Sequence, residues 1–234
     1  MAREIVIGGL AIDVLFKDIK NVHLSVYPPT GRVRVSAPEH MTIESVRLFA
    51  VSKIGWIRKH QGKVRSQRRE TPREYIERES HRVWGRRYLL CIKDASKSEV
   101  VLGHRTLEIS SPEGSSREHR RKALDAWYRT ELRERAAPVL EKWARLLGVP
   151  FSSFTIQRMK TKWGSSNPKR HTVRLNLELA KFPPECLDYV ALHELAHFVV
   201  PTHSERFRSL LDAKMPGWRN VRDRLNEGPL AQLA

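Results

Sequence analysis

The sequence predicts an α+β protein in which a mainly β N-terminal region precedes a domain dominated by helices. Residues 22–38 contain two alternating runs around Pro-Pro-Thr-Gly, which is typical of a β-hairpin. Residues 83–110 alternate again in the manner of strands, whereas apolar side chains recur at helical spacing over about 117–147. Because the strands come first and the helices mostly later, we predict α+β rather than alternating α/β.

The N-terminal region is expected to be mainly β with one helix. Between residues 41 and 64 the apolar period becomes helical, and Thr42 is a suitable N-cap. The predicted buried face of this helix comprises Ile43, Val46, Ala50, Ile54 and Ile57. The polar loop at 110–116 suggests a division into domains 1–112 and 113–234. No internal repeat is visible.

The second domain is expected to contain a long helix, a small sheet and a buried helix. Pro138 should kink or split the long helix, and Gly148 should end it. Pro184 suits the first position of the buried helix. The remaining predicted elements are strands at FTIQRM and at 172–180, and helices at about 204–214 and 218–226.

The composition indicates a folded, strongly basic protein. Forty per cent of its 234 residues are hydrophobic, which is enough for a sizeable core, and the net charge is +17. This charge favours nucleic acid, anionic lipid or acidic protein as partners, but it is equally consistent with a solvated basic surface. Cys91 and Cys186 suggest no disulfide framework, so we expect a cytoplasmic protein. No apolar run is long enough to span a membrane, and the short N-terminal apolar stretch is interpreted as a strand.

Residues 190–201, VALHELAHFVVP, place three ionisable side chains in an otherwise apolar stretch. His193 and His197 are four residues apart, so on a helix their imidazoles share a face and can converge on one cation. Burial of an unpaired imidazole or carboxylate is unfavourable, and nothing basic in the segment can pair with Glu194. We therefore predict a metal site rather than a chance occurrence of the pattern.

A third ligand is expected just after this helix, because Pro201 ends it and lets the chain turn back. His203 is the predicted ligand, and its alternative role is to cap the next helix from the surface. Glu205 is the rival ligand, although it more simply begins a helix capped by Ser204. Three protein ligands and a water make a catalytic zinc site. Glu194 is positioned to act as general base on the metal-bound water, as in the His-Glu-x-x-His signature of metalloproteases.

From MKTKWGSS to GWRNVRDRL the chain resembles the YgjP/SprT-like (M48-like) zinc metallopeptidase family. The matching segments are MKTKWGSSNPKRHTVRLNLELAKFPPECLDYVALHELAH, PTHSERF and MPGWRNVRDRL, and the N-terminal hairpin, IGWIRKH and AWYRTEL also look similar. The resemblance implies a zincin-like domain over 113–234, in which His193, His197 and His203 bind one Zn²⁺ and Glu194 is the general base. The family commonly has cysteine where this chain has Ser166, so this position departs from the family pattern.

Residues close in sequence to the predicted His-Glu-x-x-His helix are candidates for roles in substrate binding and catalysis. The strand TVRLNLELA could present its edge to an extended peptide or be an ordinary sheet strand. Trp163 is expected to pack in the core rather than in the substrate cleft. Lys162, His171 and Arg174 are each candidates to stabilise an oxyanion, and each is more simply a solvated charge.

Together these residues predict a zinc-dependent metallohydrolase, in the first place a metalloendopeptidase that uses a metal-activated water. One alternative is a metal-dependent hydrolase of nucleotides or other phosphate esters, which would suit the basic surface. Another is a protease recruited to nucleic acid by its charge. We expect peptide or protein substrates, possible nucleic-acid association, and no membrane partner.

Overall fold

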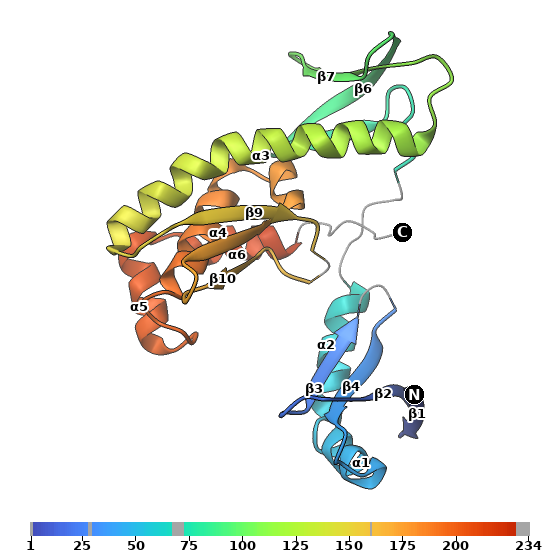
Figure 1. Ribbon diagram of the computed structural model, residues 1–234, viewed down its shortest axis with the longest axis vertical. Helices are drawn as coiled ribbons and strands as arrows, with labels where there is room; N and C mark the ends of the chain where they lie inside the picture. The colour runs from blue at the N-terminus through green and yellow to red at the C-terminus, as the bar shows by residue number, and fades with distance from the viewer. Residues whose placement is uncertain (1, 28–29, 67–72, 160, 228–234) are drawn as a thin grey trace. The chain divides into compact units, whose positions relative to one another are not determined.

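The computed structural model describes residues 2–27, 30–66, 73–159 and 161–227 (Figure 1). Contacts divide the chain into two compact units, Met1–Arg68 and Arg69–Ala234. Each unit combines sheets with helices around its own hydrophobic core. The predicted α+β class is therefore confirmed. Among the described residues, no helix combines the length and the apolar character needed to cross a bilayer.

The first unit is a four-stranded sheet with two helices packed against it. The strand order is β1-β2-β4-β3, with a parallel β2–β4 pair between two antiparallel pairs. Its elements are β1 (Ala2–Ile7), β2 (Leu10–Lys17), β3 (His23–Tyr27), β4 (Arg32–Pro38), α1 (Ile43–Ser52) and α2 (Ile54–Ser66). Thr42 caps α1 as predicted, because its hydroxyl accepts a hydrogen bond from the Ser45 backbone N–H at 3.2 Å. The predicted single helix is interrupted at Lys53.

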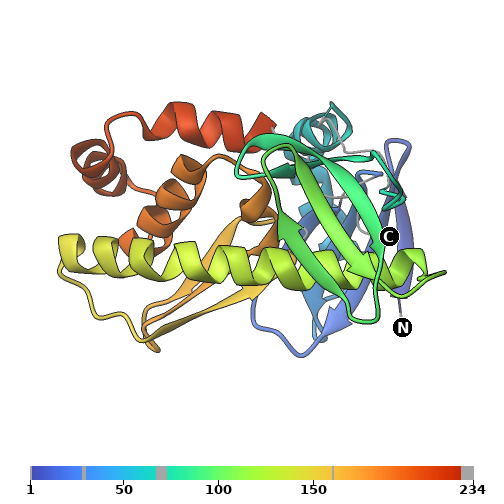
Figure 2. The ribbon, with the colours of Figure 1, turned by 90° about the horizontal axis from the view of Figure 1, so that it is seen from above.

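The second unit contains two sheets and four α-helices among its described residues. Its elements are β5 (Ser80–Val83), β6 (Arg86–Asp94), β7 (Glu99–Leu102), β8 (Thr106–Ser111), α3 (Arg117–Leu147), β9 (Ser153–Gln157), β10 (Gly164–Asn167), β11 (Thr172–Asn176), the 3₁₀-helix η1 (Leu177–Lys181), α4 (Pro184–Ala196), α5 (Glu205–Lys214) and α6 (Trp218–Glu227). The sheet β5-β6-β8-β7 lies against the N-terminal half of α3 (Figure 2). The sheet β10-β11-β9 and α4 pack along the rest of this helix.

The division between the units differs from the predicted boundary at 112/113, which lies inside the second unit. The turn between β5 and β6 explains why. The backbone N–H of Trp84 donates to Ala180 O at 2.8 Å, and that of Gly85 donates to Lys181 O at 3.1 Å. These bonds join the β5–β8 sheet to η1, and its buried residues belong to the same core as α3 and α4.

The two four-stranded sheets have the same topology, although no repeat is visible in the sequence. In each sheet the first two strands are antiparallel, the second and fourth are parallel, and the third is antiparallel to the fourth. Two-residue turns with positive φ join the first two strands at 8–9 and at 84–85. Pro-Glu loops at 38–42 and 112–116 then lead into N-capped helices. The two sheets can share a topology without a sequence repeat, because strand pairing depends on apolar alternation and turn geometry rather than on residue identity.

The long helix α3 shows that packing can override a local helix breaker. Pro138 was predicted to kink or split the long helix, and it lies inside α3 without splitting it. Its ring is on the exposed face, whereas Ala136 and Leu140 are fully buried, so tertiary packing offsets the lost backbone hydrogen bond. Gly148 ends the helix in the left-handed region (φ 65°), as predicted.

We expect Ile57→Ala and Leu140→Ala to destabilise different parts of the chain. Both side chains are fully buried, but they belong to separate cores, and truncation of such a side chain costs about 2–5 kcal/mol. Hydrogen exchange followed by mass spectrometry should therefore show faster exchange within residues 2–66 for Ile57→Ala and within 73–227 for Leu140→Ala. Equal acceleration in both units by either variant would contradict two independent cores.

Candidate metal centre

The helix α4 presents the predicted site residues from the middle of the second unit. Pro184 lies in its first turn, as predicted, and α3, β10, β11, α5 and α6 all contact it. Because neighbours surround the helix, most of its side chains are buried and apolar. His193 and Glu194 interrupt this apolar surface, and His197 follows as the C-cap residue.

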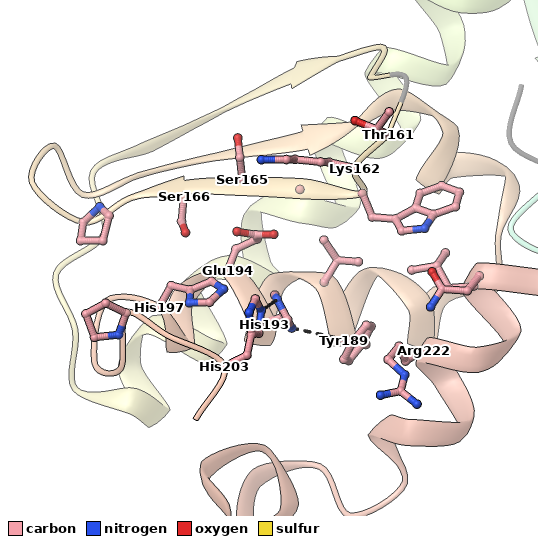
Figure 3. A pocket seen from close by; sticks show the side chains of 17 residues that line it. Thr161, Lys162, Ser165, Ser166, Tyr189, His193, Glu194, His197, His203 and Arg222 are labelled. Carbon is pink, nitrogen blue, oxygen red and sulfur yellow. Dashed lines mark hydrogen bonds between the residues drawn. The ribbon is translucent and has the colours of Figure 1, made fainter. Parts of the chain in front are cut away.

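Three imidazoles converge at the end of α4. His193, His197 and His203 each offer a nitrogen, and these three atoms lie within 4.8 Å of one another. The Nε2 atoms of His193 and His203 are 3.0 Å apart (Figure 3). We call these residues the histidine cluster. The structure brings His203 into the cluster and leaves the rival Glu205 outside it, in the first turn of α5.

Two of the imidazoles are oriented through their Nδ1 atoms. His193 Nδ1 lies 3.4 Å from the Tyr189 hydroxyl, one helical turn earlier, and His197 Nδ1 lies 3.3 Å from the carbonyl oxygen of Val200. When each Nδ1 carries the proton and donates it in these contacts, each Nε2 has a free lone pair. This is how outer contacts select the tautomer of a metal-binding histidine.

The Phe207 ring packs against all three imidazoles of the cluster and forms an apolar surface on one side of it. It is almost completely buried, and its ring centroid lies 5.1, 4.7 and 5.0 Å from the rings of His193, His197 and His203. The position follows from the predicted cap, because Ser204 accepts a hydrogen bond from the Phe207 backbone N–H and begins α5 there. An apolar surface excludes water from one side of the cluster and strengthens electrostatic interactions above it.

Burial keeps the imidazoles of His193 and His197 in the form that binds metals. Desolvation lowers the pKa of His193 to about 4, and the neighbouring His197 and His203 act in the same direction. Desolvation also lowers the pKa of His197. At neutral pH both rings are therefore uncharged, and neutral imidazole is the ligand form.

Glu194 is buried beside the cluster and held on two sides. A Cβ built on Gly164 would lie 2.7 Å from Glu194 Cγ, so the backbone of β10 contacts this side chain directly. Burial raises the pKa of Glu194 to about 7, while a hydrogen bond with the Ser166 side chain and the charge of Lys162 act in the opposite direction. Ser166, where the resemblance predicts cysteine, thus affects the site through Glu194.

A cavity of about 690 Å³ opens beside the cluster. Its lining comprises Thr161, Lys162, Trp163, Gly164, Ser165, Ser166, Pro168, Tyr189, Val190, His193, Glu194, His197, Pro201, His203, Arg222, Leu225 and Asn226 (Figure 3). Of the three oxyanion candidates, only Lys162 lines it. Trp163 lines the cavity and also packs edge-on against Phe182, at 4.8 Å between centroids.

The sheet strand beside the cavity is not the one suggested by the sequence. TVRLNLELA forms β11 only as far as Asn176 and then becomes the 3₁₀-helix η1. In the sheet order β10-β11-β9, β11 is central and has both edges paired. Among the strands that the structure describes, β10 is the one with an unpaired edge next to α4. The suggestion that the β11 edge accepts a peptide is therefore wrong, because both neighbouring positions are already occupied.

Several residues of the site were missed by reasoning from the sequence. Tyr189 could have been found, because it precedes His193 by four residues and so shares its helix face. Phe207 lies in the first turn of α5, whereas His203 precedes the N-cap of that helix, so helix periodicity does not place these two residues together. Gly164 and Arg222 come from segments distant in sequence, and no local pattern indicates their contact with the α4 site.

A helix bearing His-Glu-x-x-His, open to a cavity and with a third histidine beside it, is the arrangement of a metallopeptidase. The family model of the YgjP-like metallopeptidase domain matches residues 20–228. The chain therefore belongs to the YgjP-like metallopeptidase family, whose members require a metal and act on peptides or proteins.

Two solved structures are also similar to part of the chain. One is the metallopeptidase zymogen abylysin of Pyrococcus abyssi, which is 25% identical in sequence, with a TM-score of 0.36. The match covers 38% of this chain and 90% of the abylysin chain. The other is the zymogen jannalysin of Methanocaldococcus jannaschii, with 26% identity, 38% and 92% covered, and a TM-score of 0.35. A search of the curated proteins gave no match.

Proposed function

We propose that this protein is a zinc-dependent peptidase in which His193, His197 and His203 hold one Zn²⁺ and Glu194 is the general base. The observation on which the proposal depends is the convergence of three imidazoles beside a buried carboxylate in one cavity. Family membership supports a metal and a peptide substrate. The choice of zinc and the roles of the individual residues belong to the proposal.

The donor set fits zinc. Two nitrogen ligands of a tetrahedral zinc ion are about 3.3 Å apart, since each Zn–N bond is about 2.0–2.1 Å. The three nitrogens of the cluster lie within 4.8 Å of one another, and the Nε2 atoms of His193 and His203 are 3.0 Å apart, so small ring movements suffice to bind an ion. Neutral imidazoles prefer zinc to magnesium or calcium, which favour oxygen ligands. A bound zinc ion would polarise the scissile carbonyl and lower the pKa of a water from 15.7 to roughly 7.

Glu194 supplies the proton transfer. Glu194 is buried beside the histidine cluster and lines the same cavity, so its carboxylate can accept a proton from the attacking water and then give it to the leaving amine. Gly164 and Ser166 restrict where the carboxylate can lie. Positioning of this kind is worth a large part of the catalytic effect.

The edge of β10 offers a place for the substrate backbone. This strand pairs with β11 on one side, and its residues Gly164, Ser165 and Ser166 line the cavity. An extended peptide can form main-chain hydrogen bonds with such an edge as an added strand. Its scissile bond would then pass between β10 and the histidine cluster.

Gly164→Ala should lower peptide turnover by about 10²-fold while zinc stays bound. The new methyl group would overlap Glu194 and displace its carboxylate, and a misplacement of about 1 Å can cost this much. Gly217→Ala is the matched control, because a Cβ there meets nothing within 4 Å. Steady-state kinetics and metal analysis measure both effects. Unchanged turnover in Gly164→Ala would show that the position of Glu194 is unimportant.

The proposed function is tested by metal analysis combined with substrate panels. Metal-replete protein should contain one zinc ion per chain and cleave members of a peptide library, and a chelator should abolish cleavage until zinc is restored. Hydrolysis of nucleoside triphosphates without any peptide cleavage would favour the phosphate-ester alternative instead. Peptide cleavage that survives complete metal removal would refute the proposed mechanism.

The cytoplasmic location and nucleic-acid association stay predictions. Cys91 and Cys186 are both free thiols, which supports a reducing compartment. The net charge of +17 supports binding to polyanions. Binding to DNA or RNA that weakens steeply with salt would support recruitment, and no binding at low salt would remove it.

A further inference from the structure

Two cationic side chains line the cavity without a role in the mechanism above. Lys162 lies just before β10 on one wall, and Arg222 lies on α6 on the other wall, beside Tyr189 (Figure 3). Among the described lining residues, Glu194 is the sole carboxylate. Two cations face one buried acid in this cavity, and a bound zinc ion would add further positive charge, so the cavity is electropositive.

The backbone that carries Lys162 is anchored, while its ammonium group has no acidic partner. The Asn176 side chain is fully buried and donates a hydrogen bond from Nδ2 to Lys162 O at 2.8 Å. Within the described part of the chain, no carboxylate oxygen lies within ion-pair distance of Lys162 Nζ. Lys162 lines the same cavity as Glu194, so its ammonium group is available to an incoming anion.

Arg222 is oriented by an aromatic stack and only weakly paired. Its guanidinium lies 5.2 Å from the centre of the Trp218 ring, which in turn stacks on Tyr189 at 6.0 Å. Arg222 Nε and Nη2 donate to Asp223 Oδ1 at 2.9 and 2.8 Å. Since Asp223 is exposed, this ion pair contributes little, and an anionic ligand can replace it.

We propose that Lys162 and Arg222 make the cavity selective for acidic peptides, with an aspartate or glutamate side chain of the substrate close to the scissile bond. This inference rests on the proposed peptidase function. Charge-assisted hydrogen bonds to a carboxylate are stronger than neutral ones. A lysine or arginine of the substrate at the same position would meet like charges and be rejected.

Matched peptides test the inference through a ratio of rates. Peptides that differ only in an Asp, Asn or Lys at each position flanking the scissile bond should give a kcat/KM ratio for Asp over Asn of at least about tenfold at one position. The ratio should fall towards one in Arg222→Gln and in Lys162→Gln. Arg219→Gln is the matched control, because Arg219, like Arg222, lies over the Trp218 ring, at 4.6 Å. Arg219 pairs with Asp212 and does not line the cavity, so the ratio should stay high in this variant.

Binding of the same labelled peptides to zinc-loaded Glu194→Gln separates this inference from the proposed function. Fluorescence anisotropy should show tighter binding of the Asp peptide than of the Asn peptide, by about tenfold. Equal affinities would overturn the inference even if the wild-type protein cleaves both peptides. Failure of the zinc-loaded wild-type protein to cleave any peptide would overturn the proposed function, while the binding ratio would still decide the selectivity. A nucleoside triphosphate that displaces the Asp peptide and is itself hydrolysed would reassign both cations to phosphate and overturn the acidic-peptide assignment.

Discussion

Glu194→Gln should retain one zinc ion per chain while its peptide turnover falls by about 10²–10⁴-fold. Glutamine has nearly the same shape as glutamate but cannot accept the proton of the attacking water. The histidine cluster does not include Glu194, so the metal content should not change. Metal analysis of the purified variant and steady-state kinetics with a cleaved peptide measure the two quantities.

Glu205→Gln is the matched control for this variant. Glu205 is an exposed glutamate in the first turn of α5, outside both the cluster and the cavity lining. Its replacement should leave turnover and zinc content as they are in the wild-type protein. If Glu194→Gln keeps the wild-type turnover, the general-base assignment is refuted. If Glu194→Gln instead loses zinc, Glu194 acts on the metal rather than on the proton.

His193→Ala should lose zinc and, with it, peptide turnover. A site with three protein ligands cannot hold its ion at a catalytic geometry after one ligand is removed. Added zinc should raise the unfolding temperature of the wild-type protein, because binding to the folded state alone stabilises it. The same addition should not shift the unfolding temperature of His193→Ala. Elemental analysis and thermal unfolding with and without zinc provide the measurements.

The third ligand is decided by comparing His203→Ala with Glu205→Gln. Since His203 belongs to the cluster and Glu205 does not, only His203→Ala should lose zinc. His104→Ala is a further control, because His104 is an exposed histidine outside the cluster. Retention of zinc by His203→Ala together with its loss from Glu205→Gln would reverse the assignment.

Local sequence rules predicted much of the second unit because they depend on short-range geometry. The cap at Ser204 and the stop at Gly148 each concern one turn of helix. The presence of the buried helix α4 was also predicted, from its apolar sequence and its N-terminal proline. Pro138 is the exception, because the long-range packing of its neighbours outweighed its local effect.

The arrangement of strands was harder to predict, since pairing joins segments that are distant along the chain. The alternating pattern of β11 indicates a strand but does not say whether its edges are paired. The domain boundary depends on backbone hydrogen bonds from the turn at 84–85 to η1, and no local sequence pattern predicts these bonds. The repeated topology of the two sheets likewise became visible only in their pairing.

For the candidate metal centre, the sequence by itself determined that His193 and His197 share one helix face with Glu194 next to it. The period of the α-helix fixes that relation wherever the helix lies. Only the tertiary structure decided that His203 completes the cluster, that Gly164 and Ser166 confine Glu194, and that Lys162 and Arg222 line the same cavity. These residues come from separate segments, and only the packing of those segments into one core sets the distances between their side chains.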